Sequence, residues 1–139
     1  MIVTLKQFKI ACNNYHMKKI LTLIFVLFTF ESFAIEKKTN FTVEAFNEAQ
    51  KAGKTIVINS WNKFCGTCLM QTKVLNEAQK DFPEVVFLSY EQTKHKDIAN
   101  LLNVEYWATI IIFKNGKEIA KEIGITNKTD IYSLIKQKI

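Results

Sequence analysis

The residues best suited to chemistry in this chain are two cysteines separated by two residues, in the run Cys65-Gly66-Thr67-Cys68. They follow a run that is β-branched and apolar at its start and ends at Trp61, and they open a stretch with helical periodicity. Residues i and i+3 of a helical turn lie about 5 Å apart, within the Cα separation that a disulfide tolerates. At a helix N-terminus, free N–H groups and the helix dipole stabilise an anion. The spacing therefore predicts thiol–disulfide exchange, with Cys65 as the nucleophile and Cys68 as the resolving thiol.

Other roles for the same pair stay open. A structural zinc site needs four ligands, and the sequence has no second pair of cysteines or histidines at ligand spacing. A site for Cu(I), a soft metal, could use both cysteines with Met70. A purely structural disulfide would close so short a loop that it restrains the unfolded chain little. Redox exchange is the favoured interpretation and a non-catalytic module, for example one binding Cu(I), is the alternative; no metal or organic cofactor is expected.

Residues 17–34 have the pattern of an export signal. Lys18 and Lys19 precede an apolar run over residues 20–30, and small residues lie just before Ile35, in Ser32-Phe33-Ala34. The run is shorter than the ~20 residues that span a bilayer as a helix. We therefore expect cleavage after Ala34 and a location in the bacterial periplasm. The alternative is an uncleaved membrane anchor that leaves the rest of the chain facing the periplasm.

Residues 1–16 do not fit the pattern of a signal peptide, so Met17 is the expected start of the protein. A start there would remove Cys12 and leave one even pair of cysteines, as expected of an exported protein without an unpaired thiol. The predicted organisation is an N-terminal extension and signal peptide over residues 1–34, followed by one domain over residues 35–139.

Length and charge narrow the functional classes. A chain of 139 residues can bury one hydrophobic core but is too short for two domains. Half of the net charge of +6 lies before residue 35, where four lysines accompany a single acid. Every basic residue is lysine, so no guanidinium group can make bidentate contacts with phosphates or base edges. We expect a monomer without a nucleic-acid partner.

Hydrophobic periodicity predicts alternating helices and strands after residue 41. Helices are expected between Thr42 and Gly53, over 66–81, around 98–102 and from about 128 onward. Strands are expected over 55–61, 85–88, 109–113 and 118–120, the last two joined by the hairpin signal Asn115-Gly116. This order predicts an α/β domain whose central mixed sheet is covered by helices on both faces.

Two segments carry a resemblance to a known family. Residues 57–68, VINSWNKFCGTC, and residues 109–118, TIIIFKNGKE, stand in the order found in the thioredoxin family, with Gly124 at the expected distance beyond. The resemblance covers nearly all of residues 41–139, and residues 41–54 resemble exported bacterial members. It implies a thioredoxin-like fold and a protein thiol–disulfide oxidoreductase. Its partners would be client proteins with thiols or disulfides and, for a reductant, a membrane electron donor.

The chain departs from the family pattern at three positions around the cysteines. Thr67 replaces the proline of the usual Cys-Gly-Pro-Cys motif, whose middle residues tune the redox potential. Asn59 replaces a buried aspartate that assists proton transfer at the resolving cysteine, and an amide cannot titrate. Ala108 replaces a cis-proline that faces the disulfide.

The resemblance also indicates where clients would bind. It implies client contacts at Trp61, which packs beside the cysteines, and at Trp107, Ala108 and Thr109. A cis peptide bond costs ~2.5–4 kcal/mol before a non-proline residue but only ~0.5–1 kcal/mol before proline. We therefore predict a trans Trp107–Ala108 bond, with the loop that faces Cys65 displaced from its usual position.

Overall fold

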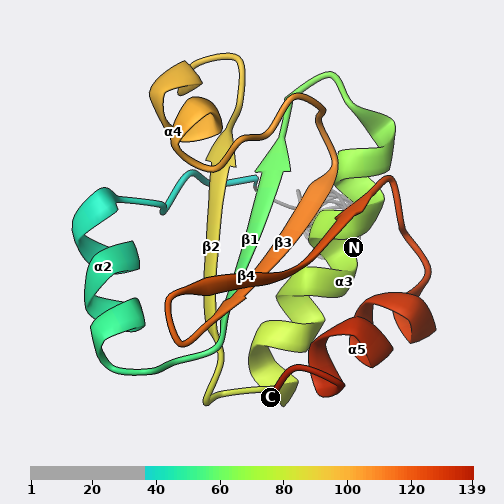
Figure 1. Cartoon of the computed structure of the whole chain (residues 1–139). Coiled ribbons are helices and arrows are strands. Elements are labelled where there is room, and N and C mark those ends of the chain that lie inside the picture. The colour runs from blue at the N-terminus through green and yellow to red at the C-terminus, as the bar shows by residue number, and fades with distance from the viewer. Residues whose placement is uncertain (1–36) are drawn as a thin grey trace, which may run out of the picture. The chain divides into compact units, whose positions relative to one another are not determined.

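The computed structural model describes residues 37–139 (Figure 1). The predicted signal peptide, the start at Met17 and the cleavage after Ala34 lie outside these residues and stay predictions. Eight elements follow one another along the described chain: α2 (Val43–Lys51), β1 (Ile56–Trp61), α3 (Gly66–Asp81), β2 (Val86–Glu91), α4 (Lys96–Leu101), β3 (Thr109–Lys114), β4 (Lys117–Ile123) and α5 (Lys128–Lys136). Within this part of the chain, no helix is long and apolar enough to cross a membrane.

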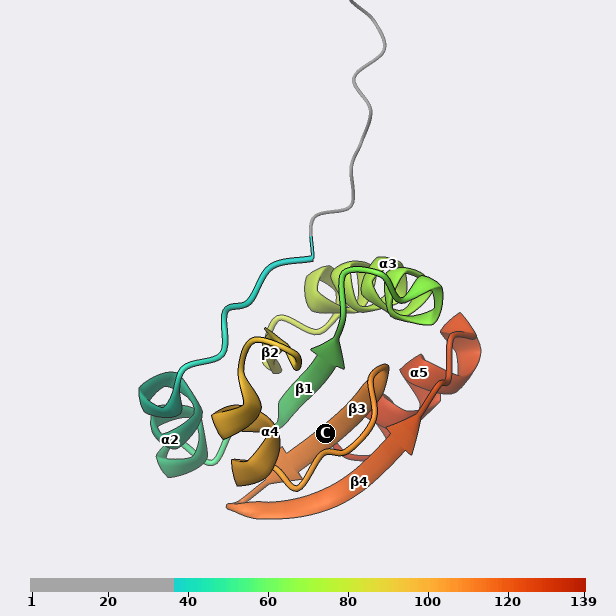
Figure 2. The same cartoon turned by 90° about the horizontal axis from the view of Figure 1, so that it is seen from above.

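The four strands form one mixed sheet in the order β2-β1-β3-β4. β1 is parallel to β2 and antiparallel to β3, and β3 and β4 form an antiparallel hairpin. Helices α2 and α4 cover one face of the sheet, and α3 and α5 cover the other (Figures 1 and 2). The predicted fold class, a mixed sheet with helices on both faces, is confirmed.

The two faces of the sheet carry separate hydrophobic cores because successive side chains of a strand point to opposite faces. Ile56 and Ile58 of β1 pack with Phe46 of α2 and Ile98 of α4, whereas Val57 packs with Leu75 of α3. β3 divides in the same way: Ile111 joins the first core, and Ile110 and Ile112 join the second, beside Ile131 and Ile135 of α5. The central strands are therefore apolar on both faces, which fixes the position of α3 against β1.

The helix that carries the cysteines begins and ends where the sequence predicted, at Gly66 and Asp81. Two strands extend several residues beyond their predicted ends, β2 to Glu91 and β4 over Lys117–Ile123, and β3 ends one residue later than predicted, at Lys114. Both extensions contain polar residues, and backbone pairing continues through them because it does not require apolar side chains. In the turn between β3 and β4, Asn115 and Gly116 have φ angles of 51° and 73°, as a tight hairpin requires.

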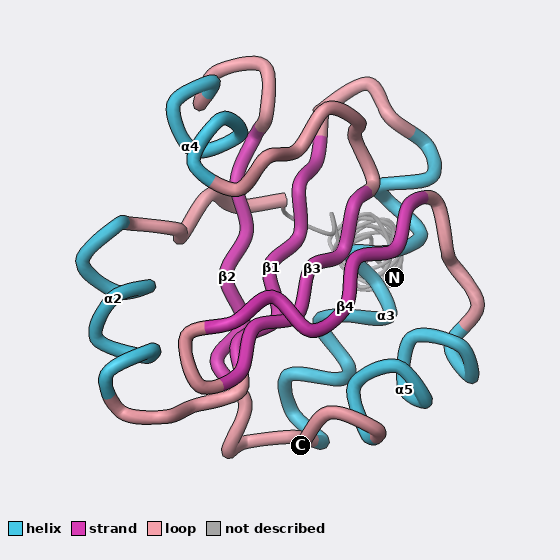
Figure 3. Tube along the Cα trace, in the orientation of Figure 1, coloured by secondary structure: helices cyan, strands magenta, loops and turns pink. Residues whose placement is uncertain are grey.

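The sheet topology brings two loops to the same end of the molecule. Ser60, near the end of β1, lies opposite Thr109, the first residue of β3. The loop from β1 to α3 and the loop from α4 to β3 therefore meet at this end, as Figure 3 shows. The first loop carries the two cysteines into α3, and the second carries Ala108.

Candidate active site

Cys65 and Cys68 form a disulfide, with their Cα atoms 5.2 Å apart. Cys65 is the N-cap residue of α3, with an extended backbone at φ −92° and ψ 110°. Its Sγ accepts a hydrogen bond from the backbone N–H of Cys68, at 3.0 Å. A sulfur in this position faces the free N–H groups and the positive end of the dipole of a 16-residue helix. The local structure therefore stabilises negative charge on Cys65 once the disulfide is reduced.

The two cysteines differ in their access to solvent. Cys68 is fully buried, in a cluster with Trp61 and Ala108, whereas Cys65 lies half-buried at the edge of that cluster. Thr67, the residue that replaces the family's proline, is half-buried in the first turn of α3. An incoming sulfur atom can therefore approach Cys65 and not Cys68.

The loop before β3 packs against the disulfide through Ala108. Its peptide bond to Trp107 is trans, as predicted, since no bond within residues 37–139 is cis. Ala108 has a φ of 55°, in the left-handed region that residues other than Gly, Asn and Asp rarely adopt. Its N–H donates to the carbonyl of Ser60 at 3.0 Å, and its carbonyl accepts the N–H of Gly124 at 2.8 Å. The flanking strands thus hold Ala108 in this unusual conformation.

The other residues predicted to contact clients lie at different depths. Trp107 is 47% exposed, whereas Trp61 is 6% exposed and Thr109 only 1%. The Thr109 hydroxyl donates to the carbonyl of Tyr106 at 2.7 Å, and its backbone N–H donates to Ser60 Oγ at 3.3 Å. The structure thus brings all four residues to the end of the sheet that carries the disulfide, and of these only the Trp107 side chain extends far into solvent.

Two buried amides join the disulfide helix to this loop, a feature that the sequence analysis did not predict. Asn59 Nδ2 donates to Gln71 Oε1 at 2.9 Å, and Gln71 Nε2 donates to the carbonyls of Ala108 at 2.9 Å and Ile125 at 2.8 Å. Gln71 is fully buried. A signal was present in the sequence, because Gln71 lies three residues after Cys68, on the face of α3 that turns inward.

A lysine from the segment before α2 also reaches the cysteine loop and was not predicted. This segment runs along the outer edge of β2, where Asn40 N–H donates to the Ser89 carbonyl at 3.0 Å. Lys37 Nζ then donates to the carbonyls of Asn62 and Cys65, each at 3.0 Å. Burial lowers the pKa of Lys37, and the nearby Glu91 carboxylate partly opposes that shift. The contact joins residues 28 positions apart, so no local pattern signals it.

The described residues offer few ligands for a metal ion near the cysteines. No group of three or more His, Cys, Asp and Glu side chains within residues 37–139 is arranged to hold one. Met70, the residue that could assist a copper site, is 51% exposed on α3.

The family model described as thioredoxin matches residues 36–137 of this chain. This match extends over most of the sequence and includes both cysteines, so the chain belongs to the thioredoxin family. Among curated proteins, the thioredoxin of Mycoplasma genitalium is 29% identical over 93 residues, which are 67% of this chain and 91% of that protein. An H-type thioredoxin of Oryza sativa subsp. indica is 31% identical over 106 residues, which are 76% of this chain and 85% of that protein.

Solved structures show the same relationship. Fasciola hepatica thioredoxin is 25% identical with a TM-score of 0.63, over 69% of this chain and 89% of that one. Mitochondrial thioredoxin 3 of Saccharomyces cerevisiae, in its oxidised form, is 28% identical with a TM-score of 0.61, over 68% and 89% of the two chains. Together with the Cys65–Cys68 disulfide, family membership makes this protein a thiol–disulfide oxidoreductase.

Proposed function

We propose that this protein exchanges disulfides with client proteins outside the cytoplasm, with Cys65 as the attacking thiolate and Cys68 as the resolving thiol. The observation that carries the assignment is the difference between the two sulfurs. Cys65 is half-buried and caps α3, whereas Cys68 is fully buried beneath it. Only Cys65 combines access for a client with a helix terminus that stabilises the thiolate.

In the reducing direction, the reaction has two steps that balance. The Cys65 thiolate attacks one sulfur of a client disulfide, a bond forms between them, and the client's other sulfur leaves as a thiolate that takes up a proton. The Cys68 thiol then loses its proton and attacks Cys65 Sγ, which releases the second client thiol and re-forms the Cys65–Cys68 disulfide. Asn59, which cannot accept that proton, leaves its removal to another base or to solvent.

Client proteins would dock over the exposed aromatic side chains around the disulfide. Phe64 is 83% exposed just before Cys65, and Tyr106 and Trp107 are 61% and 47% exposed in the loop opposite. Exposed apolar groups at one end of a small domain are typical of a protein-binding surface. Trp107 is the residue of this set that stands directly beside Ala108, which packs on the disulfide.

The redox state of the Cys65–Cys68 pair in cells indicates whether the protein reduces or oxidises its clients. A reductant outside the cytoplasm has no glutathione or thioredoxin pool to restore its thiols, so it needs an electron donor in the membrane. Trapping the thiols by rapid alkylation measures this state. A mostly reduced pair indicates a reductase with such a donor, and a mostly oxidised pair indicates an oxidase or an idle disulfide.

Mixed-disulfide trapping tests the roles of the two cysteines. Cys68→Ser leaves Cys65 able to attack but removes the thiol that would release the client from Cys65. Mixed disulfides with clients should therefore accumulate. Cys65→Ser should trap little, because Cys68 is buried. Equal trapping by both variants, or the reverse order, would show that the assignment is wrong. Stoichiometric Cu(I) binding without turnover of a protein disulfide would instead support the copper-binding alternative.

Export has a separate test because it rests on the sequence alone. The tripartite segment that ends at Ala34 supports a mature protein that starts at Ile35. N-terminal sequencing of the protein recovered from a bacterial host measures this start. A soluble cytoplasmic species that starts at Met1 or Met17 would contradict it.

A further inference from the structure

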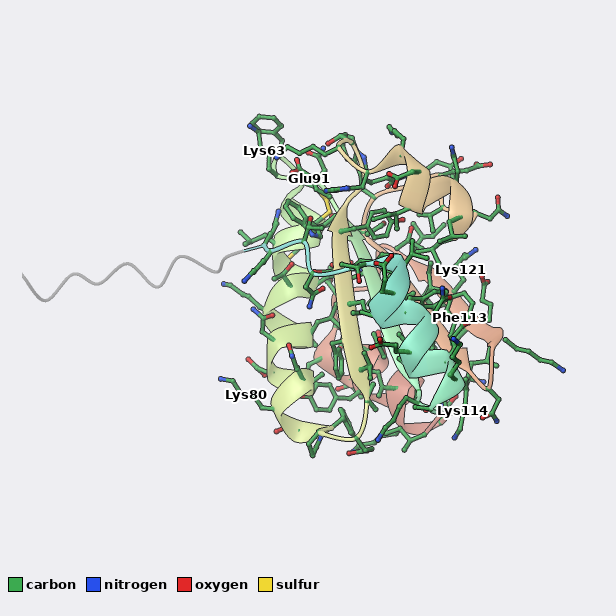
Figure 4. All side chains as sticks on the ribbon, turned by 90° about the vertical axis from the view of Figure 1, so that its left-hand side faces the viewer. Lys63, Lys80, Glu91, Phe113, Lys114 and Lys121 are labelled. Atoms are coloured by element: carbon green, nitrogen blue, oxygen red, sulfur yellow. A yellow bond between two sulfur atoms is a disulfide. The ribbon has the colours of Figure 1, made fainter. Side chains whose placement is uncertain are left out.

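Half of the residues that line a groove beside Cys65 carry a charge. Cys65 and Trp61 form part of its wall, and the charged groups around them are Lys37, Lys63, Lys94 and Glu91. Lys63 and Glu91 lie at the same end of the molecule, and Lys80 lies at the opposite end of α3 (Figure 4). Any client segment that extends from Cys65 in this direction must pass over these groups.

Three of the four charges are positive, and the single acid is already paired. The Glu91 carboxylate lies 2.6 Å from the Lys94 ammonium, and the Glu91 side chain is 5% exposed against 67% for Lys94. A passing client therefore meets the lysine and not the carboxylate. Three ammonium groups and one carboxylate leave a net charge of +2 on the groove, and of +1 when Cys65 is a thiolate.

Of the other two lysines, Lys37 is held at the groove by hydrogen bonds, and Lys63 is an exposed residue of its wall. Lys37 Nζ is fixed by the carbonyls of Asn62 and Cys65, the second of which belongs to the nucleophilic residue itself. Lys63 Nζ lies 4.7 Å from the centroid of the Phe64 ring, which places its charge beside the exposed aromatic. The N-terminal end of α3 adds a further partial positive charge at Cys65.

We propose that this groove selects client segments with acidic residues next to the reacting cysteine. The inference rests on the proposed function, since it concerns the substrates of the same disulfide. Carboxylates that flank the client sulfur would lie within the Debye length of about 8 Å from the lysines and lower the free energy of the encounter complex. A client segment with lysines at the same positions would be repelled.

Three cysteine peptides of equal length measure this selection. The cysteine is flanked by two aspartates, two asparagines or two lysines, and is joined by a disulfide to an uncharged pyridinethiol. The wild-type protein, reduced beforehand and freed of reductant, attacks the peptide sulfur through Cys65. The peptide–pyridine disulfide breaks, and pyridinethione leaves with a proton and is followed by its absorbance. Cys68 then attacks Cys65 and releases the peptide thiol.

The readout is the ratio of the second-order rate constants for the aspartate and asparagine peptides. This ratio is independent of the intrinsic reactivity of Cys65, which is common to both reactions. At low salt we expect a ratio of about five, with the lysine peptide slowest, because exposed charge pairs contribute about two- to fivefold each. The ratio should fall towards one at high salt.

Two variants with matched controls test whether the groove lysines cause the preference for the aspartate peptide. Lys63→Gln and Lys37→Gln should each lower the ratio about twofold. Lys80→Gln removes the same charge from the far end of α3, and Lys38→Gln removes it from the exposed neighbour of Lys37. Both controls should leave the ratio unchanged.

The outcomes separate this inference from the proposed function. Equal rates for the three peptides, or control variants that lower the ratio as much as Lys63→Gln, would overturn the groove as the selective surface. Release of pyridinethione from none of the peptides would instead overturn the proposed exchange itself.

Discussion

Gln71 Nε2 donates a hydrogen bond to the carbonyl of Ala108 at 2.9 Å, which ties the helix that carries the cysteines to the loop that faces them. The same nitrogen donates to the Ile125 carbonyl at 2.8 Å, and Asn59 fixes the orientation of the amide through Gln71 Oε1. All the polar atoms of the Gln71 side chain are thereby satisfied in a fully buried position.

Replacing Gln71 by Leu should lower the free energy of unfolding by about 1–3 kcal/mol, because the change leaves Asn59 Nδ2 and the Ile125 carbonyl buried without this partner. The measurement is urea denaturation of the oxidised protein. Gln79→Leu makes the same change on the exposed side of α3 and should shift stability by less than about 0.5 kcal/mol. Equal losses in the two variants would show that the amide network contributes nothing specific.

Asn59→Asp should destabilise the protein in a pH-dependent way. The new carboxylate would face Gln71 Oε1, which offers no proton, and burial would raise the pKa of the introduced carboxyl above the ordinary ~3.9 of aspartate. At pH values between the ordinary aspartate pKa of ~3.9 and the raised pKa of the folded state, the folded state binds more protons than the unfolded state. Stability relative to the wild type therefore falls as pH rises through this window and stays low above it.

At pH values below about 4 both states are protonated, and the carboxyl O–H can donate to Gln71 as the amide does, so the Asn59→Asp variant should approach the wild type. At pH 7 the loss should be about 2 kcal/mol. Asn47→Asp, on the exposed surface of α2, is the matched control and should show no such slope. A loss that is independent of pH would contradict a buried, titrating carboxyl.

Ala108→Gly should stabilise the fold by about 1 kcal/mol, since glycine adopts a φ of 55° without the steric cost that alanine meets. Ala45→Gly, inside α2, should change stability by a similar amount in the opposite direction. Ala108→Pro should destabilise by more than about 1 kcal/mol, because proline is confined to φ near −65° and lacks the N–H that bonds to Ser60. Thermal unfolding of the three variants measures these signs.

The order of the elements could be predicted from the sequence because each element carries a local signal. The run from Ile56 to Trp61 begins with three apolar residues and is buried on both faces, Thr42 caps α2 with its hydroxyl, and Asn115-Gly116 forms the hairpin. The extensions of β2 and β4 could not be predicted, because their polar residues resemble those of loops while their backbones continue the ladder.

The candidate site likewise has features with a local sequence signal and features without one. The cysteine pair could be predicted because its spacing, its helix terminus and its disulfide all depend on four consecutive residues. The contacts of Gln71 and Lys37 join residues far apart in the chain, and only the folded sheet brings them to the disulfide. A trans bond before Ala108 followed from the cost of the cis form, but the left-handed φ that accompanies it had no sequence signal.

Trp107→Ala should slow exchange with protein clients and leave exchange with small disulfides unchanged. The indole is 47% exposed beside Ala108 and offers apolar area that a folded client can cover, whereas a small disulfide needs only access to Cys65. Loss of a well-placed aromatic contact costs about 1–2 kcal/mol, so kcat/KM for insulin reduction should fall about five- to thirtyfold. Leu101→Ala, which removes a 56% exposed side chain from α4, is the control and should leave both rates near the wild type. If Trp107→Ala slows both kinds of disulfide equally, the indole supports the structure around Cys65 and does not contact clients.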